Sequence, residues 1–288
     1  MTWVNTVIQG ILLGGLYALF AAGLSLVFGV MRVVNLAHGD LSVLAAFIAL
    51  LLVEHAGMSP LGSLAIVVPA MFVVGWVLQA GIINFALHTE LAPLLATFGV
   101  AIVLQNVLQE AFSADSRGLD AGSLETSSIR IGDDIGIGWF PLLTFATSVV
   151  VLVALHLLLN RTQLGRALRA TSDDQRTARH VGIDNRRIYS LAMGISLATV
   201  AIAGVFLAIR TTFSPSIGPA RLIFGFEAVI IGGLGSLWGT LAGGIVLGVA
   251  QAVGAQIDAG WGVLTGHLVF LAVIALRPQG LFPRTVTA

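Results

Sequence analysis

The side chains able to do chemistry in this chain are polar residues set within long apolar runs. Asn35, His38 and Asp40 stand together between two apolar segments, and Glu227 is the one acid in segment 222–257. Polar and ionisable groups at membrane depth are costly, so they usually face a cavity, a partner chain or one another. These four residues therefore predict the lining or the gate of a route across a membrane.

Each of these residues also has a structural explanation. Asp40 would cap a helix that begins at Leu41 by accepting backbone N–H groups, while Asn35 closes the preceding turn. For Asp40 we favour capping. Glu227 would face the route, pair with Arg221 or lie at the external membrane interface, and we favour the interface.

A second group of candidate lining residues lies on the apolar runs themselves. Thr97 and Gln105 would line a route, or each would bond to a neighbouring helix instead. The glycine run Gly232, Gly233 and Gly235 follows no strand, so it is not a nucleotide-binding loop. Such glycines allow close helix packing or a turn, and we favour packing over contact with a solute.

Several kinds of chemistry are excluded. His38 beside one carboxylate is not a ligand set, so we expect no metal and no cofactor. The chain has no lysine and no Gly-x-x-x-x-Gly-Lys-Ser/Thr run, so it does not hydrolyse ATP by a P-loop. No nucleophile with a paired acid and base occurs at helical spacing, so we expect no catalytic residue and no enzyme activity.

The composition places the chain in lipid. Of its 288 residues 57% are hydrophobic and 10% are charged, with a mean hydropathy of +0.98, whereas a soluble domain carries about 25% charged residues. The net charge of zero gives no indication of nucleic-acid binding. We predict an all-α, polytopic membrane protein: a single transmembrane domain, residues 1–288, with the lipid bilayer as its surroundings.

Apolar runs predict about eight transmembrane helices, near 4–30, 41–54, 61–87, 91–111, 139–160, 188–209, 222–257 and 262–276. Two interruptions stand out, at Arg32–Asp40 and at Ile231–Ser236. A helix of 36 residues would span about 54 Å against a core of about 30 Å, so the glycines must break it or form a re-entrant turn. One break in each half suggests two pseudo-repeated halves, as in transporters with paired discontinuous helices.

The arginines are concentrated in one loop. Seven of fourteen lie between Arg161 and Arg187, and short loops rich in arginine stay in the cytoplasm during insertion. We therefore predict a cytoplasmic loop at 161–187 and an external loop at 112–138. In the external loop the alternating run Ser128–Ile131, flanked by glycines, predicts a small hairpin.

The cytoplasmic loop has its own helical signal. Ser172 to Gln175 has the form of a capping box that opens a short helix, which would run to about His180 and end at Gly182. A charged surface helix between two spans suits docking into a groove of a soluble partner. The alternative is that its charges only set the topology.

Four ordered stretches resemble one known family. They read NLAHGDL at 35–41, GRALRA at 165–170, EAVIIGGLGSLWGT at 227–240 and LRPQGLF at 276–282. Together they resemble the inner-membrane permeases of ATP-binding cassette (ABC) importers for branched-chain amino acids, the Liv family, over residues 1 to 285.

That resemblance implies a non-catalytic permease subunit in the bacterial inner membrane. Its partners would be a second homologous permease, forming a heterodimer, two ATPases, and a periplasmic solute-binding protein. The short helix would couple closure of the ATPases to the spans, and the match assigns this role to a set of loop residues: Arg169, Asp173, Asp174, Arg176, Arg179, His180 and Gly182.

The solute implied by the resemblance is a branched-chain or other hydrophobic amino acid. Urea, short amides and aromatic acids are alternatives within the same family. A secondary transporter or channel is an alternative from a different class, and it would need its own ion-coupling acids. Asp40 and Glu227 are the only candidates for that task.

Overall fold

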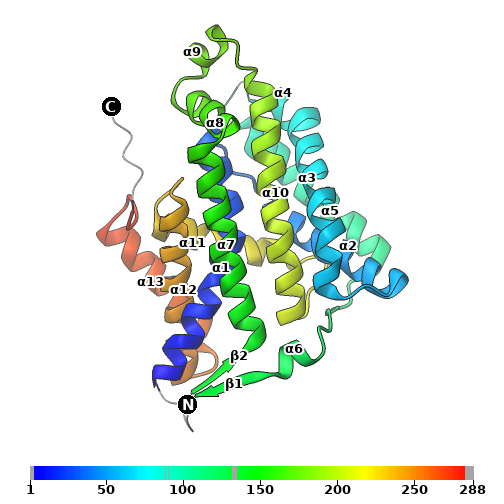
Figure 1. Ribbon diagram of the computed structural model, residues 1–288, viewed down its shortest axis with the longest axis vertical. Coiled ribbons are helices and arrows are strands. Elements are labelled where there is room, and N and C mark those ends of the chain that lie inside the picture. The colour runs from blue at the N-terminus through cyan, green and yellow to red at the C-terminus, as the bar shows by residue number, and fades with distance from the viewer. Residues whose placement is uncertain (1–2, 88, 90, 132–134, 283–288) are drawn as a thin grey trace.

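The computed structural model describes residues 3–87, 89, 91–131 and 135–282. It is a bundle of long helices with a small sheet at one end (Figure 1). Helices α8 (Gln163–Asp173) and α9 (Gln175–His180) lie at one end, and strands β1 (Ser128–Ile131) and β2 (Ile135–Gly138) lie at the other. We call these the arginine-rich end and the hairpin end.

Within the described residues, seven helical units are long and apolar enough to cross a membrane. One unit is continuous over three elements: α3 (Pro60–Leu78), the π-helical turn η1 (Gln79–Ile83) and α4 (Asn84–Ala86). The other six are single helices: α1 (Trp3–Met31), α2 (His38–Ala56), α5 (Ala92–Phe112), α7 (Trp139–Arg161), α10 (Asn185–Arg210) and α12 (Leu237–Ile257). Helices α11 (Gly218–Gly232) and α13 (Trp261–Leu276) are shorter. The predicted all-α polytopic class is confirmed.

Both predicted interruptions are present. Residues 32–37 separate α1 from α2, and residues 233–236 separate α11 from α12. Gly233 and Gly235 have φ angles of 103° and 78°, a backbone region that other residues rarely adopt. Helix α11, at 15 residues, is about 22 Å long and so does not span the hydrocarbon core by itself.

Small residues let α1, α11 and α12 approach one another closely. A Cβ atom at Gly14 of α1 would lie 2.4 Å from the Cα atom of Ile245, and one at Gly232 would lie 2.1 Å from the Gly239 carbonyl oxygen. Without a hydrophobic effect between helices in lipid, such contacts are a main source of association. The packing role that we favoured for Gly232 therefore agrees with the geometry.

The two halves are built as inverted counterparts. Helix α12 runs antiparallel to α1, since Gly244 lies against Gly14 and Gly248 against Gly10, and α11 runs antiparallel to α12. Helix α3 of the amino-terminal half likewise runs antiparallel to α10 of the carboxyl-terminal half, with Gly75 beside Met193. Helix α2 runs parallel to α10, as α11 does to α1, so α2 and α11 each pack beside the long helix of the opposite half.

The predicted hairpin is confirmed. Strands β1 and β2 are antiparallel, with Ser128 opposite Gly138, and the short helix α6 (Ser123–Thr126) precedes them. The Gln9 side chain of α1 donates to the Gly136 carbonyl oxygen at 2.7 Å. Farther along the loop, Arg117 and Phe213 exchange two backbone hydrogen bonds of 2.8 Å each, so the loop also holds the segment before α11.

We predict that Gly14→Leu destabilises the bundle, because the new side chain would separate α1 from α12. The free energy of unfolding should fall by about 3 kcal/mol, measured as a lower melting temperature in detergent. Gly99→Leu on α5 is the matched control, since no atom lies within 4 Å of a Cβ built there. Equal melting temperatures for the two variants would contradict the close-packing argument.

Candidate functional site

The linker of residues 32–37 folds back into the bundle. His38, at the start of α2, lies beside the middle of α1: its Nε2 atom is 3.2 Å from the Phe20 carbonyl oxygen. The two rings meet edge to face at 5.2 Å. Because α1 continues to Met31, Phe20 lies about 16 Å before its end. Helix α2 therefore begins at membrane depth.

Polar side chains satisfy the backbone of this linker. The Ala37 N–H donates to the Asn35 side-chain oxygen at 3.0 Å, and the Leu36 N–H donates to the Thr97 hydroxyl of α5 at 3.2 Å. Backbone groups at membrane depth need such partners, because lipid supplies none. Asn35 closes the turn as expected, and Thr97 bonds to a neighbouring segment, the second of its two predicted roles.

Asp40 lies inside α2, so the predicted cap at Leu41 is wrong. The helix begins three residues earlier, at His38, because Asn35 already holds the turn. The Asp40 carboxylate is 1% exposed and accepts a 2.9 Å hydrogen bond from the Gln105 side chain of α5.

The start of α11 also lies beside Asp40. A Cβ atom at Gly218, the first residue of α11, would lie 2.1 Å from a carboxylate oxygen of Asp40. The two interrupted halves thus meet where α2 and α11 begin. We call this cluster the junction, and its members are Asn35, His38, Asp40, Thr97, Gln105 and Gly218.

The junction contains five of the predicted route residues in one cluster. Four of them, Asn35, His38, Asp40 and Thr97, are buried, and Gln105 is half-buried. Among the described residues, His38 Nδ1 and one Asp40 oxygen have no hydrogen-bond partner. Polar capacity is therefore left over at membrane depth, which a moving solute or a water molecule could use.

Glu227 lies apart from the junction and pairs with a residue that the sequence did not single out. It is 3% exposed, and its Oε1 atom contacts the His267 ring of α13. The same ring stacks on Phe224 at 6.0 Å. Arg221 instead donates to the Thr211 hydroxyl at 2.7 Å. The predicted pairing of Glu227 with Arg221 is therefore wrong, and the Glu227 carboxylate is buried against α13.

The glycine turn also lies apart from the junction. Gly233 and Gly235 fall between α11 and α12, and Gly235 lines a cavity together with Ser25 and Gly29 near the end of α1. The structure therefore places this turn toward the arginine-rich end, away from the place where α2 begins.

Helix α8 is fixed to the ends of α1 and α7. Ser172 donates to the Gly29 carbonyl oxygen at 2.6 Å, and Arg169 donates to the Leu159 carbonyl oxygen and, at 3.2 Å, to the Asn160 side chain. Ser172 therefore lies within α8, and the predicted capping box is wrong. Arg169 is half-buried, so it anchors α8 and leaves the exposed face to other residues.

Asp174 caps α9. Its carboxylate accepts hydrogen bonds from the Thr177 hydroxyl at 2.6 Å and from the Arg176 and Thr177 N–H groups at 2.8 and 3.2 Å. These bonds, that of the hydroxyl first, hold the pKa of the Asp174 carboxyl below its usual 3.8. The helix ends at His180 as predicted, and Gly182 follows with a φ of 87°. Five charged or titratable side chains of this segment are exposed: Asp173, Asp174, Arg176, Arg179 and His180.

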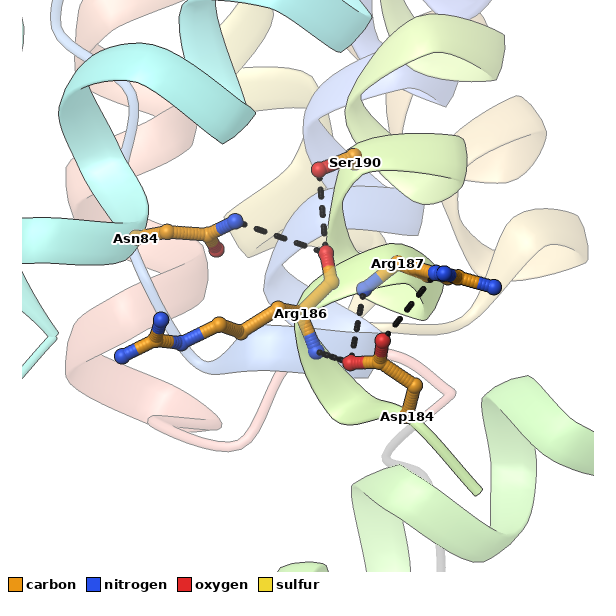
Figure 2. A network of polar contacts seen from close by, with 5 residues as sticks. All are labelled: Asn84, Asp184, Arg186, Arg187 and Ser190. Carbon is orange, nitrogen blue, oxygen red and sulfur yellow. Dashed lines mark hydrogen bonds and ion pairs between the residues drawn. The ribbon is translucent and has the colours of Figure 1, made fainter. Parts of the chain in front are cut away.

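A second capping aspartate leads into α10. Asp184 accepts from the Arg186 and Arg187 N–H groups and forms a 3.1 Å ion pair with the Arg187 side chain (Figure 2). The Arg186 carbonyl oxygen receives hydrogen bonds from Asn84 of α4 and from Ser190. The start of α10 is thereby attached to the α3–α4 unit, a contact that no sequence motif indicated.

No three His, Cys, Asp or Glu side chains of the described residues lie close enough to hold a metal ion. What the structure presents is a polar junction inside a polytopic bundle, with an anchored, exposed basic helix at one end. This arrangement is typical of a membrane permease. The chain belongs to the family of the branched-chain amino acid transport system permease component, whose model matches residues 6–276.

Relatives extend over nearly the whole chain. It is 29% identical to the high-affinity branched-chain amino acid transport system permease protein BraD of Pseudomonas aeruginosa, over 98% of this chain and 96% of BraD. It is 25% identical to LivH of Escherichia coli, with the same coverage. LivM of the same organism is 35% identical over 127 residues, or 43% of this chain and 30% of LivM. The chain is a multi-pass protein of the inner membrane.

We predict that Gln105→Leu destabilises the junction, because Asp40 loses its side-chain donor. The free energy of unfolding should fall by about 1.5–3 kcal/mol, measured by thermal unfolding in detergent. Asn106→Leu is the control, since Asn106 is exposed and its side chain donates to the Ile102 carbonyl oxygen of its own helix. If both variants melt at the same temperature, the Asp40–Gln105 bond does not hold α5 to α2.

We predict that Asp174→Ala unfolds α9 locally, whereas Asp173→Ala leaves it intact. A carboxyl with a lowered folded pKa stabilises the helix above its unfolded pKa, and this stabilisation is lost as pH falls through the folded value. Hydrogen exchange across Gln175–Val181, corrected for intrinsic rates, should therefore rise below pH 3.8 in the parent chain. Protection that is unchanged by Asp174→Ala would rule out the cap.

Proposed function

We propose that this chain is a permease subunit of an ABC importer that passes a branched-chain or other hydrophobic amino acid to the cytoplasm. The observation that supports this proposal is the exposed basic helix α9 in a chain of this family. A bundle without a nucleotide-binding loop needs an outside source of energy, and α9 is a surface that such a source could move. Two ATPase subunits would supply the energy, and a periplasmic binding protein would deliver the solute.

The proposed orientation follows from charge. The arginine-rich end would lie in the cytoplasm, where the ATPases are, because arginines in short loops are retained there. The hairpin end, with the external loop 112–138, would then face the periplasm. The binding protein would dock on that side.

The coupling path that we propose runs from α9 through α8 to α1. The exposed side chains Arg176 and Arg179 would contact an ATPase. Movement of α8 would reach Gly29 through Ser172 and the end of α7 through Arg169. Because the linker of residues 32–37 begins where α1 ends, displacement of α1 would alter the junction. Asn35, His38, Asp40, Thr97 and Gln105 are the proposed gate.

Glu227, Gly232, Gly233 and Gly235 have a different place in this proposal. Glu227 and His267 would hold α11 against α13, and the three glycines would allow the tight turn from α11 into α12. They would support the route without lining it.

A second permease would complete the route. E. coli LivH and LivM are both named as permease proteins of a branched-chain amino acid transport system, and this chain is similar to both. That pair of relatives supports a heterodimer of two homologous permeases. The experiment is to tag this chain at its carboxyl terminus, extract it from native membranes and identify what co-purifies. Two ATPases and a different permease are expected, and a lone homo-oligomer would overturn the proposal.

We predict that the double variant Arg176→Glu with Arg179→Glu prevents the ATPases from co-purifying. Reversing two exposed charges would repel the partner surface, so ATP-driven uptake in vesicles should fall by a factor of about 10² or more. The melting temperature should not change, because neither side chain is buried. Arg117→Glu, on an exposed residue of the opposite end, is the control. Normal assembly of the double variant would exclude α9 as the contact.

A further inference from the structure

A cavity at the arginine-rich end carries polar groups, and the transport proposal places no ligand there. Its volume is about 170 Å³, and it lies between the last turns of α1 and α7, the inner face of α8, and the turn that leads into α12. Leu26, Val30 and Leu168 form apolar walls. Ser25, Asn160 and Arg169 supply polar groups. The cavity is therefore amphiphilic.

Among the described residues, the cation in this cavity has no anionic partner. The Nη1 atom of Arg169 bonds to the end of α7, but Nε and Nη2 have no acceptor among the described residues. No carboxylate in the described part of the chain lies within 4.0 Å of this guanidinium. A half-buried guanidinium with free N–H groups favours an oxyanion, which it can bind with two parallel hydrogen bonds.

The start of α12 supplies further hydrogen-bond donors to the cavity. Ser236 caps this 21-residue helix by accepting from the Gly239 N–H at 3.1 Å. The N–H groups of Leu237 and Trp238, both of which line the cavity, have no acceptor among the described residues. Free amides and the helix dipole at such a start attract negative charge.

A buried hydroxyl without a hydrogen-bond partner is a second, independent indication that the cavity binds a ligand. Ser25 is 1% exposed and lines the cavity, yet its Oγ atom has no hydrogen-bond partner in the described structure. A buried hydroxyl without a partner costs about 1–3 kcal/mol, so such groups are normally paired. An oxygen atom of a bound ligand would complete it.

We propose that this cavity binds the phosphate of an anionic phospholipid headgroup. Arg169 and the start of α12 would bind the phosphate oxygens, and the Ser25 hydroxyl would donate to one of them. The apolar walls distinguish a lipid from free phosphate, because they can take the glycerol and the first carbons of an acyl chain. The exposed Trp238 ring, 5.9 Å from His156, stands beside the cavity at the level of the last turn of α7.

The test is native mass spectrometry of the full chain in detergent, titrated with phosphatidylglycerol. Arg169→Gln should weaken binding about tenfold. Ser25→Leu should do the same by filling the cavity, and it leaves the bonds of Arg169 to α7 in place. Arg166→Gln, on the exposed face of the same helix, should leave the affinity unchanged. Phosphatidylcholine should bind about tenfold more weakly, and millimolar inorganic phosphate should not displace the lipid.

Three results would overturn the proposal. Equal lipid affinity for the parent, Arg169→Gln and Ser25→Leu would mean that the cavity is not the site. A loss with Arg166→Gln as large as that with Arg169→Gln would mean attraction by surface charge only. Displacement by inorganic phosphate would assign the site to a soluble phosphate and exclude the lipid. The readout is lipid binding, so none of these results depends on transport.

Discussion

The structure depends on one constraint: a stretch of non-helical backbone lies at membrane depth and must be satisfied by protein. Residues 33–37 have no i to i−4 ladder, and lipid offers no hydrogen bonds. Asn35 and Thr97 supply the missing acceptors, and the linker contacts α5 through Thr97 and α10 through Met193. The polar residues that mark the junction are therefore also what permits the break in the first place.

Close helix contacts follow from the same constraint. A linker that runs back beside α1 must be enclosed, and the enclosing helices must approach one another without bulky side chains. Gly14 against Ile245, Gly39 against Gly218 and Gly204 against Ser42 all bring backbone within reach of backbone. Close packing at small residues thus promotes helix association in lipid, where the hydrophobic effect that drives it in water is absent.

Local signals predicted much of this fold. Apolar length predicted the spans, glycines at 231–236 predicted the break before α12, and alternation at Ser128–Ile131 predicted the hairpin. Contacts between distant segments were not readable. The start of α2 at His38 depends on a hydrogen bond within residues 35–37, and the partner of Glu227 lies 40 residues away on α13. Arg169 was predicted as one of the arginines of a basic cytoplasmic loop, yet its guanidinium bonds to the end of α7 and the residue is half-buried.

The crossing of the two halves has a consequence for biogenesis. Helix α2 packs beside α10 and α11 packs beside α1, so each half supplies the long helix against which α2 or α11 of the other half packs. During synthesis the start of α2 enters the membrane long before α10 and α11 leave the ribosome. Until then its polar groups must be shielded by water, by the insertion machinery or by a temporary arrangement of the first helices. The amino-terminal half is therefore an unfinished structure that only the last third of the chain completes.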